Sequence, residues 1–142
     1  MHALLDVNVL IALLDGAHLH HGAAMRWLGN HITHGWASCP LTQNGCVRVM
    51  SQPAYPNARA TSEIASRLRD ATQQPEHVFW ADDLSLLDDA LFDWHELFNH
   101  RQLTDAYLLA LAVKHDGVFV TFDHAVPLKA VAGASARHLV LL

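Results

Sequence analysis

Three aspartates next to hydrophobic segments are the residues in this sequence best suited to chemistry. Asp6 and Asp123 each follow a short apolar stretch, and Asp105 precedes a longer one. Carboxylates that lie together repel one another unless a cation neutralises them. Their oxygens suit Mg²⁺ or Mn²⁺, and such ions can generate hydroxide and orient a phosphodiester. If the fold brings the three together, the pattern indicates metal-assisted hydrolysis of a nucleic-acid backbone.

The segment 101–123 contains two of these aspartates and predicts how they meet. Residues 104–115 have the broad apolar face of a buried helix, Gly117 suits a left-handed cap, and 118–122 is typical of a buried strand. The ten residues from Asp105 to the end of the helix at position 115 span roughly 15 Å. The five residues from position 118 to Asp123 span roughly 16 Å in an extended strand. If the strand runs antiparallel to the helix, Asp123 returns to the level of Asp105.

Alternating strands and helices predict the rest of the fold. Because the expected strands are hydrophobic throughout, they indicate a mainly parallel sheet of four to five strands, covered by helices on both faces. At this length we expect a single α/β domain over residues 1–142. The expected strands are 2–5, 36–38, 77–80, 118–122 and a buried strand at 138–142; the expected helices are 7–14, 18–31, 41–50, 59–72, 84–91 and 104–115, with another turn at 125–130. Ligands of such sheets bind beyond the carboxyl ends of the strands, where Asp6 and Asp123 lie.

Three segments of the chain resemble the signature segments of PIN-domain ribonucleases, and among these the VapC-type toxins of bacterial toxin–antitoxin pairs. They are LLDVNVLIAL at 4–13, LTDAYLLALA at 103–112 and VTFD at 120–123. The resemblance spans the chain in the same order and spacing. It implies a PIN-like three-layer α/β/α sandwich, Mg²⁺- or Mn²⁺-dependent cleavage of RNA, and inhibition by a cognate antitoxin. It also implies a homodimer, to which the need of exposed apolar helices to pack adds support.

The same resemblance assigns roles to individual residues. By position, Asp6 and Asp105 would be the principal metal ligands, and Asp123 would complete the catalytic acidic cluster. Three further side chains would orient these carboxylates: Asn8, Thr104 and Thr121.

One position departs from the family. A further acid, commonly Glu, is usual on the helix after the second strand, and the matching residue here is Gln43. An amide can coordinate a metal or hold a water, but it supplies no charge and cannot act as a base. A catalytically weakened or inactive PIN-fold module, which binds RNA or an antitoxin without cleaving, therefore remains the alternative function.

The remaining polar residues are assigned more modest roles. Arg48 and Arg101 are expected among the contacts to RNA phosphates, because backbone binding needs cations. Asp82 follows an expected strand and is an outlying candidate for the acidic cluster. The twelve histidines lack the partners and spacing of a zinc site, so we interpret them as solvated or capping residues.

The composition says more about the cellular location of the protein than about its function. A net charge of −5 is unusual for a nucleic-acid binder, although six of the fourteen acids fall between positions 82 and 96. No export signal and no apolar run long enough for a membrane helix is evident. Cys39 and Cys46, expected as buried free thiols, suit a reducing cytoplasm.

Other protein classes that gather acids at a sheet edge fit less well. A signalling receiver needs a second acid beside Asp6 and a lysine after its last strand, and a phosphatase needs Asp-x-Asp where this chain has Asp-Val-Asn. A metal-free ribonuclease that uses paired histidines as acid and base would be insensitive to chelators.

Overall fold

A parallel five-stranded sheet forms the centre of the protein, in the order β3-β2-β1-β4-β5. The structure is a computed structural model, which describes residues 1–97 and 99–142. The strands are β1 (Ala3–Leu5), β2 (Trp36–Ser38), β3 (His77–Phe79), β4 (Val118–Thr121) and β5 (Leu139–Leu141). Every neighbouring pair is parallel, as the hydrophobic strand pattern predicts.

Burial follows the position of each strand in this order. Strands β1 and β2 are fully buried, and β4 is nearly so. Strand β5 pairs only with β4, so it is an edge strand, and Leu141 is 43% exposed. The expectation of a buried last strand is therefore wrong, because an apolar run alone does not distinguish an edge strand from a central one.

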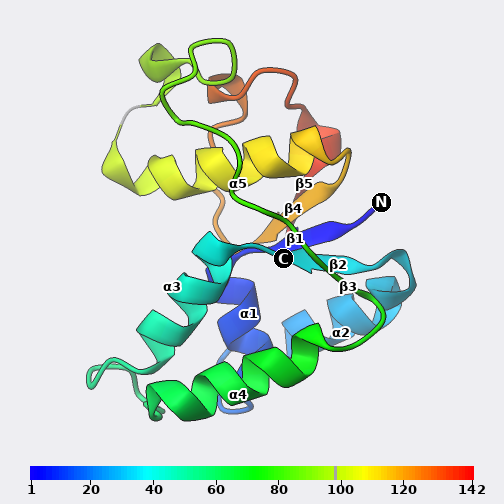
Figure 1. Ribbon diagram of the computed structural model, residues 1–142, viewed down its shortest axis with the longest axis vertical. Helices are drawn as coiled ribbons and strands as arrows, with labels where there is room; N and C mark the ends of the chain where they lie inside the picture. The colour runs from blue at the N-terminus through cyan, green and yellow to red at the C-terminus, as the bar shows by residue number, and fades with distance from the viewer. Residues whose placement is uncertain (98) are drawn as a thin grey trace.

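Helices cover both faces of the sheet in three layers (Figure 1). They are α1 (Val7–Leu14), α2 (His21–His31), α3 (Pro40–Met50), α4 (Thr61–Thr72) and α5 (Leu103–Lys114). Side chains of α5 pack with Leu4 and Phe119 on one face, while those of α1, α3 and α4 pack with Leu5 and Val120 on the other. The alternation of neighbouring strand residues between the two cores is the period of two that a strand requires.

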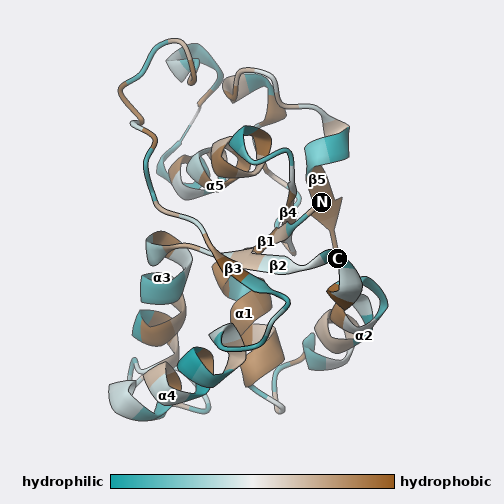
Figure 2. Cartoon of the chain, turned by 45° about the vertical axis from the view of Figure 1, so that its right-hand side comes forward, coloured by the Kyte–Doolittle hydropathy of each residue, from teal (hydrophilic) through white to brown (hydrophobic). Residues whose placement is uncertain are grey.

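Helix α1 is apolar over most of its surface (Figure 2), because other helices cover it on several sides. It packs against both α2 and α3. Asp6 precedes its first residue as the N-cap. Because β1 leads directly into α1, the buried helix fixes the position of that carboxylate at the end of the strand.

Residues 84–91 form turns rather than the expected short helix. The side chains of Ser85 and Asp88 each accept a hydrogen bond from the backbone two residues on, at Leu87 and Ala90. Such local bonds offer the backbone an alternative to helical pairing. The remaining short elements are 3₁₀ turns at Ile32–His34, Trp94–Glu96, His100–Gln102, Leu128–Ala130 and Ala136–His138.

The order of the strands places a crevice between β1 and β4. From β1 the chain adds β2 and β3 on one side, and β4 and β5 continue the sheet on the other. In open α/β sheets, ligands bind at this switch of direction, beyond the carboxyl ends of the strands. Asp6 follows β1 and Asp123 lies just beyond β4. Within the described ranges, no helix is long and apolar enough to cross a membrane.

Candidate active site

Asp6 is held in place by two hydrogen bonds at the end of β1. Its Oδ1 accepts the Val7 backbone N–H at 2.7 Å, and its Oδ2 accepts the Thr121 hydroxyl at 2.6 Å. Asp6 as a whole residue is only 6% exposed. Burial raises the pKa of Asp6 more than these bonds lower it, and the charge of Asp123 raises it further. Asp6 is therefore rigidly positioned and electrostatically unfavourable as a bare anion.

Asp105 reaches the same point from the first turn of α5, and it is 7% exposed. Burial raises its pKa to about 8, with further contributions from the charge of Asp6 and from a hydrogen bond and charge at Asp123. A carboxyl with this pKa holds a proton at neutral pH. The structure therefore brings Asp6, Asp105 and Asp123 together, as the sequence predicts.

Thr121 connects the surrounding groups to this cluster. Besides donating to Asp6, its Oγ1 accepts the backbone N–H of Asp123 at 3.0 Å and the Asn8 side-chain amide at 3.4 Å. The Asn8 Oδ1 in turn accepts the Phe122 backbone N–H at 3.5 Å. Asn8 and Thr121 therefore lie where residues that orient the carboxylates must lie. Asp123 Oδ1 accepts the Ala125 N–H at 2.8 Å.

Thr104 occupies a different position from these two residues. Although it directly precedes Asp105, its side chain is exposed and lines a cavity shared with Asp82 and Tyr107. In the described part of the chain, no hydrogen bond joins it to the three aspartates. Thr104 therefore does not hold a carboxylate in this arrangement.

The two arginines expected to contact phosphate belong to different elements of the fold. Arg101 belongs to the 3₁₀ turn just before α5, four positions before Asp105, and it is exposed. Arg48 is in the last turn of α3, and roughly 12 Å of helix separates it from the sheet edge at Pro40. Of the two, Arg101 lies closer along the chain to one of the three aspartates.

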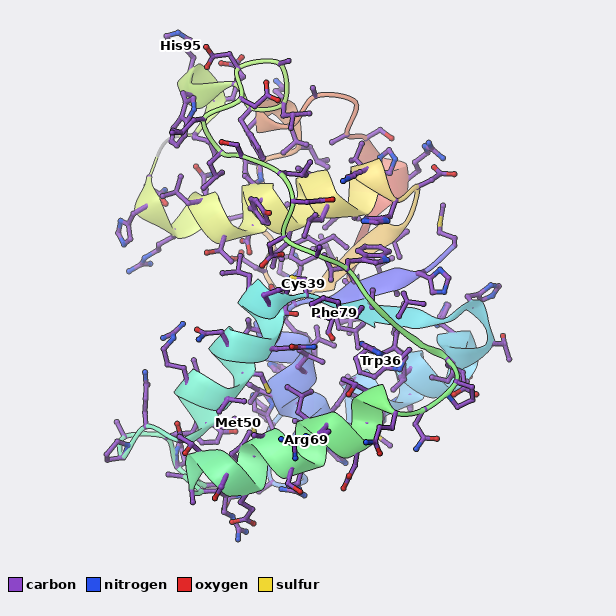
Figure 3. The ribbon with its side chains drawn as sticks, in the orientation of Figure 1. Trp36, Cys39, Met50, Arg69, Phe79 and His95 are labelled. Carbon is purple, nitrogen blue, oxygen red and sulfur yellow. The ribbon has the colours of Figure 1, made fainter. Side chains whose placement is uncertain are left out.

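The structure does not bring Gln43 into the cluster. Its Nε2 donates to the Ser38 hydroxyl at 2.9 Å, and the same hydroxyl lies 2.8 Å from Nε2 of His77. Gln43 also lines a cavity with α4 residues such as Arg69, and Figure 3 shows Arg69 and Trp36 on this side of the sheet. The strand alternation puts Thr121 on the opposite face, with α5. Gln43 thus links α3 to the end of β2, on the face of the sheet opposite Thr121.

Helix α3 has a glycine, Gly45, where it meets the start of α1. A Cβ at Gly45 would lie 2.6 Å from Cγ2 of Val7, the residue after Asp6. The side chain of Val7 therefore packs directly on the backbone of α3 at Gly45. A glycine inside an otherwise regular helix was the available signal of this close contact.

The ligand types and charges of the cluster fit Mg²⁺ or Mn²⁺. All three candidate ligands are carboxylates, which these hard cations prefer, and a cation would relieve the repulsion that Asp105 now relieves with a proton. Among the residues described, no three His, Cys, Asp or Glu side chains already form a ready-made metal site. The fit therefore rests on donor chemistry and charge.

Comparisons with known proteins agree with this arrangement. Residues 3–134 match the PIN domain family. Ribonuclease VapC44 of Mycobacterium tuberculosis is 51% identical over 142 residues, which is the full length of both chains, and Ribonuclease VapC39 of the same organism is 43% identical over 134 residues, or 94% of this chain and 96% of that one. The fold is also similar to that of a chain in the solved structure of VapBC2 from Rickettsia felis bound to a promoter DNA fragment. The two chains match with a TM-score of 0.61 and 11% sequence identity, and the match covers 87% of this chain and 89% of that chain. At that identity the likeness concerns the fold alone. The chain therefore belongs to the PIN-domain family, in the group that includes the VapC ribonucleases.

Proposed function

We propose that this protein is a metal-dependent endoribonuclease and the toxin of a type II toxin–antitoxin pair. The observation that carries the proposal is the cluster of the buried Asp6 and Asp105 with the exposed Asp123 at the switch point of the sheet, where Asp105 has a pKa of about 8. Its relatives VapC44 and VapC39 are named as ribonucleases, which supports RNA as the substrate.

The three aspartates would hold Mg²⁺ or Mn²⁺ through their carboxylate oxygens. Such an ion supplies an activated water and stabilises the charge that develops on the phosphate. Thr121 and Asn8 keep the aspartates oriented through the hydrogen bonds at the end of β4. A cation held by the cluster would favour the charged form of the Asp105 carboxyl. Arg101, at the same edge, would contact a phosphate of the RNA.

Replacement of the usual family acid by Gln43 was the reason to consider a module that binds without cleaving. Gln43 is bonded to Ser38 and lines a cavity with α4, while the three aspartates that would hold the metal are all present at the sheet edge. The cleaving enzyme is therefore the function that we propose.

We propose a cognate antitoxin as the protein partner, because the structural neighbour is a VapBC complex. We also propose a homodimer, whose mass in solution is the direct check. A cytoplasmic location suits the two buried cysteines, both of which are free thiols.

The toxin proposal is tested by expressing the chain in bacteria from an inducible promoter. We expect growth to stop with the wild type and to continue with Asp105→Asn at equal protein levels, because the variant lacks one ligand of the cluster. Co-expression of the adjacent antitoxin reading frame should restore growth. Unimpaired growth with soluble wild-type protein, or equal arrest by the variant, would contradict the proposal.

A further inference from the structure

An exposed phenylalanine lies at the same edge of the sheet as the aspartates. Phe79 is the last residue of β3 and is 55% exposed. Strand β3 is the outer strand on the β2 side and lies two strands from β1. At about 4.8 Å for each step between strands, the end of β3 is roughly 10 Å from the end of β1, where Asp6 lies. A single exposed apolar residue is common on protein surfaces, so the surroundings of Phe79 decide its meaning.

Phe79 lies on the face of the sheet that α3 and α4 cover. It pairs in register with Ser38, so the two side chains are on the same face. Trp36, two residues before Ser38 on β2, belongs to the core on the side of α1, α3 and α4. Ser38 in turn accepts a hydrogen bond from Gln43 of α3 at 2.9 Å. Phe79 is therefore next to the point where α3 contacts the sheet, and Figure 3 shows it above Arg69 on this side.

A cavity of about 260 Å³ between α3 and α4 begins at the same contact. Gln43 joins the two features, because it lines the cavity and bonds to Ser38 beside Phe79. Arg69 is the one charged residue of the lining, and no ion pair involves it among the residues that the structure describes. The lining residues are Gln43, Val47, Ala65, Leu68, Arg69 and Thr72.

The charges on the two faces of the sheet differ. Residues 80–97, which contain six acids and no lysine or arginine, pack over α5 on the other face. Residues 40–72, which form α3, α4 and the loop between them, contain four arginines and two acids. A chain of phosphates that binds at the aspartate cluster is therefore repelled on the α5 side and attracted towards α3 and α4.

We propose that Phe79 and Arg69 bind a nucleotide of the RNA a few positions from the cleaved phosphodiester, with its base stacked on the Phe79 ring and its phosphate at Arg69. The inference rests on the proposed ribonuclease function for the identity of the ligand. An aromatic ring for the base and a cation for the backbone hold single-stranded nucleic acid without reading its sequence. The site therefore adds affinity and orients the strand across the aspartates, and it selects no particular base.

A segment of a protein partner fits this surface less well than RNA does. Each nucleotide carries a flat face for stacking and a negative charge in one unit, which matches an exposed ring and an unpaired guanidinium. A peptide supplies both only where an apolar and an acidic side chain have the matching spacing. RNA at the aspartates also continues along this edge of the sheet, whereas a protein partner has no such constraint.

Two pairs of variants test the two contacts. Phe79→Ala removes the ring, and Phe79→Tyr keeps it. Leu141→Ala is the matched control, because Leu141 is a 43% exposed apolar residue at the end of β5, the opposite edge strand. Arg69→Gln removes the cation, and its control is Arg67→Gln, since Arg67 is exposed on the same helix and does not line the cavity. Thermal unfolding checks that every variant is folded.

Binding is measured with fluorescein-labelled single-stranded RNA of random sequence, in chelator to prevent cleavage. We expect Phe79→Ala to weaken binding by about 5- to 100-fold, the effect of losing one stacked base, while Phe79→Tyr and Leu141→Ala bind like the wild type. Arg69→Gln should reduce the slope of log affinity against log salt by about 0.7, the value for one phosphate contact. Arg67→Gln should leave that slope unchanged.

Cleavage of cellular RNA with Mn²⁺ gives a second measurement. Phe79→Ala should raise KM by a factor similar to its loss of affinity and change kcat little, because the ring does not touch the reacting atoms. Phe79→Tyr should restore the wild-type KM. A fall in kcat with an unchanged KM would contradict a site that only binds the RNA.

The remaining outcomes separate this inference from the proposed function. Equal RNA affinity and equal KM in the wild type and Phe79→Ala, with RNA still cleaved, would overturn the nucleotide site alone. Unchanged RNA binding together with weaker antitoxin binding would assign this surface to the protein partner instead. RNA binding that depends on Phe79 in a protein that cuts no RNA would support the site and overturn the ribonuclease. A folded wild type that neither binds nor cuts RNA would overturn both.

Discussion

The hydroxyl of Thr121 donates a 2.6 Å hydrogen bond to Asp6, a residue 115 positions earlier in the chain. A hydroxyl has one donor and two acceptor positions, and this one uses all three, since it also accepts from Asp123 and Asn8. The end of β1, the first turn of α1 and the turn after β4 are thereby joined through a single oxygen. The geometry of the aspartate cluster depends on that atom.

Removal of this hydroxyl should therefore weaken metal binding more than it weakens folding. We expect Thr121→Val to lower the affinity for Mn²⁺ by about 10- to 100-fold, the usual effect of losing a group that orients a metal ligand. Isothermal titration measures the affinity directly. Thr121→Ser keeps the hydroxyl and should bind nearly as well as the wild type. Equal losses in the Val and Ser variants would refute this role.

The stability of the metal-free protein should fall as the pH rises. Asp105 has a pKa of about 8 in the folded protein, against an ordinary value of 3.8, so between these values the folded state binds more protons than the unfolded state. Stability is then lost with increasing pH, and the raised pKa of Asp6 acts in the same direction. Urea unfolding with chelator at pH 5 and pH 8.5 should differ by at least about 1 kcal/mol.

Asp105→Asn is the control for this pH dependence, because an amide does not titrate. We expect a clearly smaller loss of stability in the variant, and at pH 8.5 with chelator it should be more stable than the wild type. Mn²⁺ should stabilise the wild type at that pH and have little effect on the variant. Parallel stability curves for the two proteins would show that Asp105 is not the titrating group.

The close approach of α3 to α1 gives a prediction for Gly45. An added Cβ would lie 2.6 Å from Cγ2 of Val7, so Gly45→Ala should destabilise the fold by about 1–3 kcal/mol. Trimming the partner with Val7→Ala should recover part of that loss. Gly29→Ala in α2 is the matched control, because no described atom beyond its chain neighbours and the nearby backbone of its own helix lies within 4 Å of its Cβ position. A Gly45→Ala protein as stable as the control would contradict the contact.

The two arginines should differ in their effect on RNA binding. Arg101 lies just before α5 at the edge of the cluster, whereas Arg48 lies in the last turn of α3. We expect Arg101→Gln to weaken binding of uncleaved RNA and to reduce the slope of log affinity against log salt by about 0.7, the value for one contact to a single-stranded phosphate. Arg48→Gln should leave the slope unchanged. An unchanged slope in both variants would remove Arg101 from the interface.

The aspartate cluster could be predicted from the sequence because its geometry depends on topology. In a parallel sheet the strands end at one edge, so Asp6 and Asp123 had to lie there once the strands were recognised. The matching lengths of the helix and the strand between Asp105 and Asp123 predicted that Asp105, the third member of the cluster, lies at the same edge. Gln43 could not be placed in this way, because successive helix residues differ by about 100° in direction and the rotation of α3 is set by packing.

Two local details depend on tertiary contacts that the sequence does not display. The left-handed residue after α5 is Asp116, with φ of 50°, and not Gly117. Gly117 is required for a different reason, since a Cβ there would lie 2.5 Å from the carbonyl oxygen of His2. Likewise, the polar side chains at 85–88 bond to their own backbone and replace a helix that hydrophobic spacing favoured.

The most direct test of the central claim is cleavage of purified cellular RNA by the wild type and by Asp105→Asn, with Mn²⁺ and with excess chelator. We expect discrete fragments from the wild type with Mn²⁺ and none with chelator. The variant should react at least about 100-fold more slowly, the scale expected when a group that stabilises the transition state is lost. Thermal unfolding of both proteins confirms that each is folded. Cleavage that persists in chelator, or that the variant performs at the wild-type rate, would contradict a metal-dependent nuclease built on these three aspartates.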